Sequence, residues 1–167
     1  MAENQNRDVI SILLPTRGRK EVLKNSLESL LSKAKYPDRI EILFGVDEDD
    51  QGVIDYIRDD LSEVFKPLNV EARASVFKPL GYENLHIYVN TLAGNATGEW
   101  LFFWNDDCLM ETKNWDTVID KHKGKFKLLA PKDNHDGHPY AILPIVPKDW
   151  FILMGHLSQN PQNDAWL

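Results

Sequence analysis

Short apolar runs and longer segments with helical spacing alternate along most of this chain. Residues 9–14 are almost all apolar, and Pro15 ends the run. A run of this kind is typical of a strand buried on both faces, as in parallel sheets. Leu and Ala residues then recur at helical spacing over residues 23–34, which predicts an amphipathic helix that ends before Pro37.

The same alternation continues beyond the first strand and helix. Further strands are expected at residues 40–46, 70–77, 100–104 and 126–130, and further helices at 53–61 and 115–122. The pattern is weakest at 70–77. Residues 81–96 place Leu85, Val89 and Leu92 on one helical face, but Leu85, Ile87 and Val89 also fit a strand. Periodicity alone leaves both interpretations of that segment open.

This order of elements predicts an α/β protein with a mostly parallel sheet and helices on both faces. In such sheets, ligands bind beyond the carboxyl ends of the strands. Thr16 and Arg17 follow the first strand, Asp47 ends the second, and Asp106 and Asp107 follow the fourth. We therefore expect these side chains to lie at one edge of the sheet.

Composition indicates an ordinary globular domain. The chain has 167 residues, of which 43% are apolar and 27% charged, and single domains take about 100–200 residues. No apolar run approaches the length of a transmembrane segment, and the first eight residues are polar. The one cysteine, Cys108, suits a reducing compartment. We expect a protein of the cytoplasm, in a bacterium or a virus-infected host cell.

The net charge of −7 argues against a nucleic-acid-binding protein, which would need a basic face. Acidic residues are instead clustered at 47–50, 59–60 and 106–107. A negatively charged protein that handles an anionic substrate needs a local cation between them. A divalent metal ion is therefore worth considering.

Asp106 and Asp107 are the first candidates for such a site. Two carboxylates beside a buried strand repel each other and lose solvation, and Mg²⁺ or Mn²⁺ would relieve both costs. The alternative is a polar turn that closes the strand, since aspartates are common in turns. The sequence around the pair leaves both interpretations open.

Other candidates also have structural alternatives. Asp47 suits a ribose hydroxyl or a base N–H, or it belongs to a solvated loop before a helix. Thr16 either contacts a nucleotide or caps a helix, and Arg17 suits a phosphate. We interpret Arg19 as a surface charge. Asp164 is an acid that could act as a general base, although nothing around it requires that role.

Taken together, these segments resemble the family 2-like, nucleotide-sugar-dependent glycosyltransferases of the GT-A type. The resemblance is carried by residues 12–19, 26–31, 41–47 and 96–107, together with Gly81 and Asn90. It implies a Rossmann-like GT-A fold with three layers, and a helix rather than a strand at residues 81–96. It further implies a single domain, 1–167, in which 9–107 bind the nucleotide sugar and 108–167 form a short acceptor-side half.

The resemblance also implies roles for individual residues. Asp107 would be a metal ligand for Mn²⁺ or Mg²⁺, with Asp106 binding the metal or the donor sugar. Residues 143–150, Gly155 and residues 163–167 are similar to the acceptor side of these enzymes, and Asp164 would be the catalytic base. The residues expected to bind the donor are Pro15, Thr16, Arg17, Asp47, Asn90 and Asp106.

The implied activity is a metal-dependent, inverting transfer of a sugar from a nucleotide diphosphate, most simply a UDP-sugar, to a hydroxyl of a glycan or another acceptor. Two departures stand out. Asn105 replaces the first aspartate of the motif. A metal-binding histidine that the family often carries downstream is missing, unless His135, His138 or His156 takes its place. One alternative is a non-catalytic nucleotide-sugar or glycan-binding module. Another, a sugar-phosphate nucleotidyltransferase, would need more glycines than residues 15–19 contain.

Overall fold

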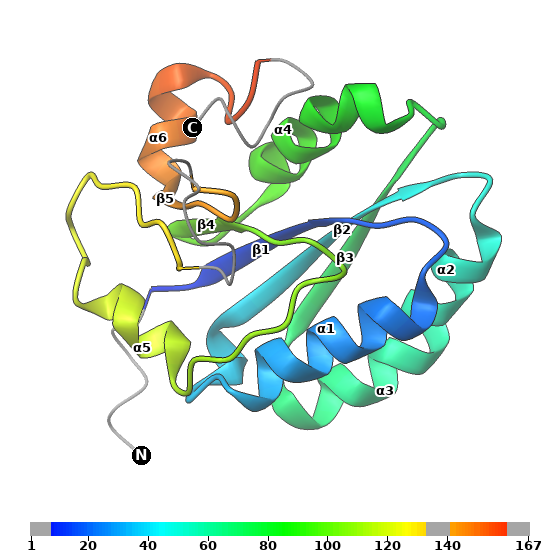
Figure 1. The fold of residues 1–167 in the computed structure, drawn as a ribbon, viewed down its shortest axis with the longest axis horizontal. Coiled ribbons are helices and arrows are strands. Elements are labelled where there is room, and N and C mark those ends of the chain that lie inside the picture. The colour runs from blue at the N-terminus through cyan, green and yellow to red at the C-terminus, as the bar shows by residue number, and fades with distance from the viewer. Residues whose placement is uncertain (1–7, 133–140, 160–167) are drawn as a thin grey trace.

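In the computed structural model, residues 8–132 and 141–159 are described, and these form a five-stranded sheet between two layers of helices (Figure 1). The strands are β1 (Ile10–Pro15), β2 (Ile40–Asp47), β3 (Glu71–Phe77), β4 (Trp100–Phe103) and β5 (Ile145–Pro147). The helices are α1 (Lys20–Ser32), α2 (Gln51–Asp55), α3 (Ser62–Phe65), α4 (Leu85–Asn95), α5 (Trp115–Asp120) and α6 (Lys148–Met154). A π-helical segment, η2 (Tyr56–Leu61), joins α2 to α3, and short 3₁₀ turns are η1 (Pro37–Arg39), η3 (Lys66–Leu68) and η4 (Tyr82–Asn84).

The strand order is β3-β2-β1-β4-β5. The first four strands run parallel, with Ile10 of β1 opposite Ile40 of β2 and Trp100 of β4, whereas β5 is antiparallel to β4. The expected α/β fold with a mostly parallel sheet is therefore confirmed. Because the chain leaves β1 for β2 on one side and returns to β4 on the other, the strand order reverses beside β1. Ligands of open α/β sheets bind at such a reversal.

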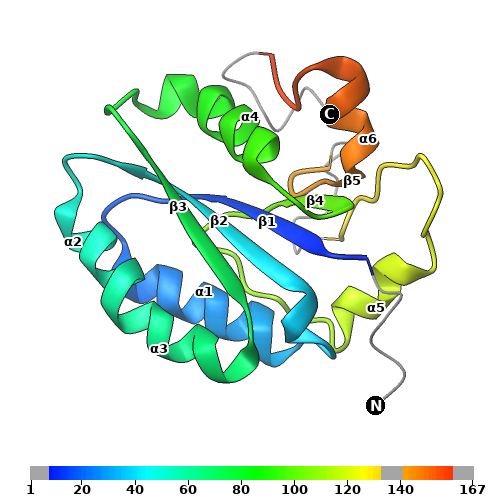
Figure 2. The same cartoon turned by 180° about the vertical axis from the view of Figure 1, so that it is seen from behind.

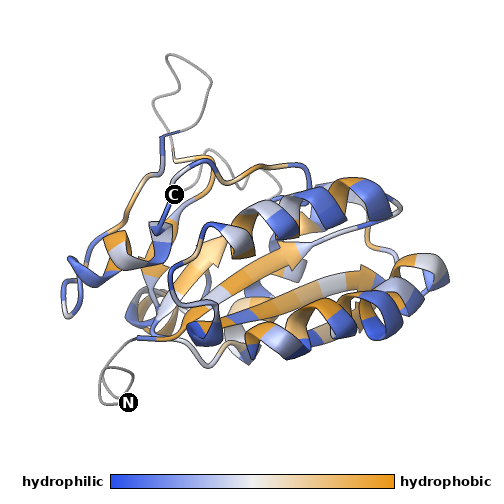
Figure 3. Cartoon of the chain, turned by 90° about the horizontal axis from the view of Figure 1, so that it is seen from below, coloured by the Kyte–Doolittle hydropathy of each residue, from blue (hydrophilic) through white to orange (hydrophobic). Residues whose placement is uncertain are grey.

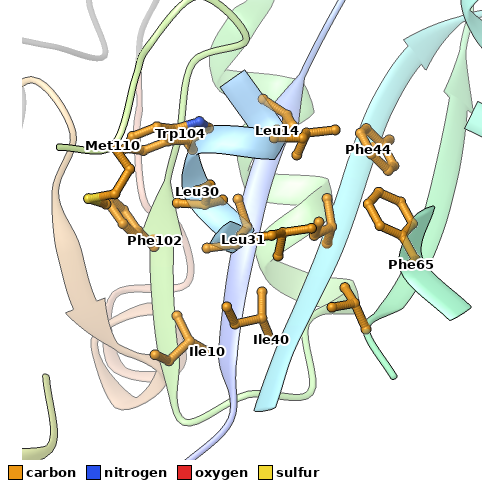
Figure 4. Close-up of a cluster of buried hydrophobic side chains, with 14 of the residues drawn as sticks. Ile10, Leu14, Leu30, Leu31, Ile40, Phe44, Phe65, Phe102, Trp104 and Met110 are labelled. Atoms are coloured by element: carbon orange, nitrogen blue, oxygen red, sulfur yellow. The ribbon is translucent and has the colours of Figure 1, made fainter. Parts of the chain in front are cut away.

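Alternate residues of each strand face opposite helical layers, as the strand period requires. Ile10 and Leu14 of β1, Phe44 of β2 and Phe102 of β4 face α1, α3 and α5 (Figure 4). Leu30 of α1 is among the side chains that pack against them. This cluster explains why alternate positions of residues 9–14 and 100–104, those that face these helices, are apolar.

The opposite face of the sheet packs against α4 and α6. Leu13 of β1, Leu43 of β2 and Leu101 of β4 contact Val89 and Leu92 of α4. Residues 85–95 are thus a helix, as the family resemblance implied and the periodicity did not decide. Figure 2 shows α4 above the sheet and β3 at its free edge, and Figure 3 shows the apolar strands between two helical layers whose outer faces are largely polar.

The prediction of a strand at residues 126–130 is wrong. Leu129 alone pairs with Ile145, exchanging two backbone hydrogen bonds of 2.8 and 3.0 Å. Pro131 follows two residues later and has no N–H to extend a ladder. The edge beside β4 is taken instead by β5, which is followed by α6. Neither element was predicted, because their seven or fewer residues are too short to show a period.

Glu41 is a buried carboxylate at the amino end of β2, with 2% of its surface exposed. It accepts hydrogen bonds from the Thr97 amide (2.6 Å), the Thr97 hydroxyl (2.9 Å) and the Gly98 amide (3.0 Å), as well as from Ser11 and Arg73. Burial alone would raise the pKa of Glu41, but these hydrogen bonds outweigh it and the pKa lies below its ordinary value. Glu41 thereby ties β1, β2, β3 and the turn before β4 together.

Candidate functional site

A pocket of about 430 Å³ opens at the carboxyl ends of β1, β2 and β4. It is the place where the strand order reverses. Its lining comprises Pro15, Thr16, Arg17 and Arg19 at and after the end of β1, Gly45 and Asp47 of β2, Gly81, Tyr82, Leu85 and Tyr88 around the start of α4, Phe103, Asn105, Asp106 and Asp107 at and after the end of β4, and Ile142. The structure thus brings together the side chains that the sequence placed after three separate strands.

Asp106 is the most constrained acid of the pocket, with 2% of its surface exposed. The Thr16 hydroxyl donates a hydrogen bond of 2.7 Å to its Oδ2, and Arg19 donates to its Oδ1. Burial raises the pKa of Asp106 above its ordinary value, although the Thr16 hydrogen bond and the charge of Arg19 act in the opposite direction. A positive charge beside Asp106 therefore stabilises the ionised form of its carboxylate.

Asp107 is half-exposed and shares the same guanidinium. Arg19 Nη1 lies 3.1 Å from Asp107 Oδ2, while Nη2 binds Asp106. The expectation that Arg19 is only a surface charge is therefore wrong. Its side chain turns back over the start of α1 toward the end of β4, a contact between residues 87 positions apart in sequence that no local pattern predicts.

A second group of polar residues surrounds Asp47 at the end of β2. Arg17 Nη1 lies 2.5 Å from Asp47 Oδ2, and its two terminal nitrogens bind Asp49 at 2.6 and 2.9 Å. The hydrogen bond from Arg17 lowers the pKa of Asp49. The Tyr88 hydroxyl donates to Asp47 Oδ1 and accepts a 3.1 Å hydrogen bond from the Leu80 amide. Asp47 is thus buried and held from two sides.

The acidic cluster at residues 47–50 does not act as one unit. Asp47 faces the pocket, whereas Asp50 accepts a 2.6 Å hydrogen bond from the Gly18 amide and caps α2 through the Val53 amide at 3.4 Å. Asp50 therefore joins the loop after β1 to the loop after β2. Negative charge at the start of α2 is favourable, in agreement with the structural alternative considered for this loop.

Of the expected site residues that the structure describes, Asn90 is not among those that line the pocket. The side chain of Asn90 accepts hydrogen bonds from the Leu157 and Ser158 amides (2.7 and 3.1 Å) and donates one of 2.6 Å to the Ser158 carbonyl. It fastens the segment after α6 to α4 and is not among the residues that line the pocket. Asp164 lies outside the described residues.

Two tyrosines of the pocket were not singled out from the sequence. Tyr88 lies one turn after Leu85 on α4, so the helical period could have placed it on the same face once α4 was known to be a helix. Tyr82 follows Gly81, whose φ of 74° turns the chain into η4. Tyr82 is 77% exposed and is among the residues that line the pocket.

Asp106 and Asp107 suit a hard divalent cation by the chemistry of their oxygen atoms. Within residues 8–132 and 141–159, no group of three or more His, Cys, Asp or Glu side chains is arranged to hold a metal. A pair of carboxylates fits Mg²⁺ or Mn²⁺ that is also bound by water and by phosphate oxygens of a substrate.

In the described part of the chain, no helix is both long and apolar enough to cross a bilayer.

The fold is shared with solved glycosyltransferases. A mannosyltransferase, PcManGT, from Pyrobaculum calidifontis in complex with GDP-Man and Mn²⁺ superposes with a TM-score of 0.71 at 13% identity, covering 92% of this chain and 48% of that one. TarS 1–349 of S. aureus in complex with UDP-GlcNAc gives 0.65 at 16% identity, covering 93% of this chain and 51% of that one. This chain therefore spans about half the length of these structures. At such identities the likeness shows the GT-A, Rossmann-like fold alone.

No significant match was found among curated protein sequences. The sequence does match the family model described as glycosyl transferase family 2, over residues 11–131. The matched part runs from β1 through the Asp106–Asp107 pair to the segment after α5, and so contains nearly every residue that lines the pocket. With that match over most of its length, and with a GT-A fold around the pocket, the chain belongs to glycosyl transferase family 2.

Proposed function

We propose that this chain binds a nucleotide-diphosphate sugar and takes part in metal-dependent, inverting transfer of the sugar to an acceptor hydroxyl. The observation that supports this most is the pocket at the strand-order reversal, which is lined both by the acidic pair Asp106 and Asp107 and by Asp47. In this proposal residues 9–107 bind the donor and residues 108–167 belong to the acceptor side.

The diphosphate would lie between the start of α1 and the end of β4. Arg19 and Arg17 supply positive charge, and the start of a helix of 13 residues favours an anion. Asp106 and Asp107 would hold Mn²⁺ or Mg²⁺, which would neutralise the diphosphate as it leaves. One of the solved structures with this fold contains both GDP-Man and Mn²⁺.

The nucleoside would lie toward β2 and α4. Asp47 keeps acceptor lone pairs for a base N–H or a ribose hydroxyl, because each of its oxygens accepts one hydrogen bond from Arg17 or Tyr88. The ring of Tyr82 offers an exposed aromatic face at the rim. We propose a UDP-sugar as donor, and a glycan or another hydroxyl compound as acceptor.

Inversion requires a base that removes the proton of the attacking hydroxyl. We propose Asp164 for this role, on the family resemblance of residues 163–167. The acceptor oxygen would attack the anomeric carbon as the bond to the diphosphate breaks, and the proton would pass to the Asp164 carboxylate.

Calorimetry with UDP and UDP-sugars, with and without Mn²⁺, tests the proposal. We expect binding that depends on Mn²⁺ and is lost in Asp107→Asn. A matched control is Asp59→Asn, which also removes one exposed carboxylate that pairs with an arginine, but outside the pocket. The proposal is wrong if no nucleotide or nucleotide sugar binds to the folded protein with Mn²⁺ present, or if both variants weaken binding equally.

A non-catalytic nucleotide-sugar-binding module is the second candidate. It is favoured by one observation, that Asn105 replaces the first aspartate of the family's motif and leaves two carboxylates after β4. Donor binding without transfer to any acceptor, unchanged in Asp164→Asn, would support it. The nucleotidyltransferase alternative is not retained, because the family match is to glycosyl transferases.

A further inference from the structure

Arg19 supplies the positive charge that neutralises the acidic pair after β4. Its Nη2 binds Asp106 Oδ1 and its Nη1 lies 3.1 Å from Asp107 Oδ2, so one planar guanidinium bridges both carboxylates. A guanidinium fork suits this two-point contact, whereas an ammonium group acts as a single point of charge. Asp106 is almost fully buried, so its ionised form depends on a nearby cation.

A divalent cation would compete with Arg19 for these oxygen atoms. The Thr16 hydroxyl already binds Asp106 Oδ2, and Arg19 binds Oδ1. A metal ion beside Asp106 and Asp107 would therefore displace the guanidinium or lie next to another positive charge. Either outcome reduces the affinity of the pair for a metal ion alone.

The Arg19 side chain could also reach a second anion in the same pocket. Half of its side chain is exposed, it lies directly before α1, and it lines the same pocket as Thr16 and Arg17. A phosphate bound at the start of α1 would lie within the reach of a guanidinium that swings away from Asp106. Arginine binds phosphate oxygens with the same fork that it uses for carboxylates.

We propose that Arg19 is an exchangeable counter-ion, which pairs with Asp106 and Asp107 in the free protein and moves to the donor diphosphate when nucleotide and divalent cation bind together. This inference rests on the proposed function, from which it takes the diphosphate and the cation. It follows that a metal ion alone binds weakly and that nucleotide and metal ion strengthen each other's binding, by the same factor in each direction.

Removal of the guanidinium then has two effects of opposite sign. In Arg19→Gln, Mn²⁺ no longer competes with a cation, so Mn²⁺ alone binds more tightly. The diphosphate loses a contact, so UDP binds more weakly when Mn²⁺ is saturating. Loss of structure at the pocket would weaken both, so this pair of changes separates an exchange of partners from damage to the fold.

The first measurement is Mn²⁺ binding without nucleotide, followed by the electron paramagnetic resonance signal of free Mn²⁺. We expect Arg19→Gln to bind Mn²⁺ about tenfold more tightly than the wild type, a factor that corresponds to about 1.4 kcal/mol. Arg58→Gln is the matched control, because Arg58 is an exposed arginine that pairs with two aspartates, Asp55 and Asp59, away from the pocket. We expect it to leave Mn²⁺ affinity unchanged.

The second measurement is calorimetric titration of UDP at saturating Mn²⁺, where we expect Arg19→Gln to bind about tenfold more weakly. Arg19→Lys keeps the charge without the fork and should lie between the wild type and Arg19→Gln in both measurements. Unchanged or weaker Mn²⁺ binding by folded Arg19→Gln would overturn the inference, as would unchanged UDP affinity. Failure of wild-type protein to bind UDP at any Mn²⁺ concentration would overturn the proposed function instead.

Discussion

Gly98→Ala adds only one methyl group, but it should strongly destabilise the protein. Gly98 lies in the turn before β4, and a Cβ added there would lie 2.5 Å from Ser11 Oγ, 2.7 Å from the Val9 carbonyl oxygen and 3.0 Å from the Ser11 amide nitrogen. All three distances are shorter than ordinary van der Waals contacts, and two of the three atoms belong to the backbone. The methyl group therefore cannot be accommodated by a side-chain rotation.

The loss of stability can be worked out from the shift of the turn before β4 that the methyl group forces. Forcing a methyl group into a packed site costs about 1–3 kcal/mol. A shift of the turn also weakens the hydrogen bond of 3.0 Å from the Gly98 amide to the buried Glu41 carboxylate, and hydrogen bonds to charged groups contribute about 1.5–3 kcal/mol each. Since a shifted bond is weakened rather than lost, we expect the free energy of unfolding to fall by about 2–4 kcal/mol.

Urea denaturation followed by circular dichroism measures this change, with Gly94→Ala as the matched control. Gly94 lies in α4, where a Cβ would make an ordinary contact of 3.8 Å with Phe151 Cζ. Alanine is the better helix former by about 1 kcal/mol, so Gly94→Ala should be neutral or stabilising. Equal stability of the two variants would refute the steric argument for Gly98.

Three further predictions concern single polar groups. Glu41→Gln should reduce the loss of folding stability that occurs as the pH falls. The pKa of Glu41 is lower in the folded protein than in the unfolded chain. The ionised carboxylate therefore stabilises the fold above the unfolded-state pKa, and this stabilisation is lost as the pH falls through the folded-state pKa. Urea midpoints between pH 3 and 7 check this, and parallel curves for variant and wild type would contradict it. Asp116→Asn should lower the free energy of unfolding by about 1–3 kcal/mol, because this fully buried carboxylate accepts hydrogen bonds from two backbone amides after α1. A thermal unfolding midpoint equal to that of the wild type would count against this prediction. Tyr88→Phe should weaken UDP binding several-fold, with a loss of about 1 kcal/mol in stability, because Asp47 loses the hydroxyl that positions it. Calorimetry compares it with Tyr56→Phe, and equal UDP affinities would show that Tyr88 acts only in packing.

The parts of the fold that the sequence predicts well are those where burial acts on a long run. Strands β1, β2 and β4 are buried on both faces, so their residues are mostly apolar and their carboxyl ends are recognisable from the polar residues there. The shared position of Thr16, Asp47 and Asp106 then follows from the geometry of parallel strands, without any knowledge of side-chain contacts.

Long-range pairing of side chains is what the sequence does not predict. The bridge from Arg19 to Asp106 and the burial of Glu41 depend on contacts between residues that are 30 to 87 positions apart. Strand β5 has three residues at the edge of the sheet, where pairing with β4 decides its conformation and no period can develop. The hydrogen bonds between the Asn90 side chain and the segment after α6 are a further long-range contact that the sequence does not predict.

The two acids after β4 differ in how much freedom they keep. Asp106 is already immobile through Thr16 and its burial, so the entropy of fixing its side chain is lost when the chain folds and not when a ligand arrives. Asp107 is half-exposed and is contacted by Arg19 at 3.1 Å, so it would lose side-chain entropy on binding a ligand only after Arg19 had left it. In the proposed site, Asp106 would therefore define where a ligand is held, and Asp107 could adapt to ligands of different shape.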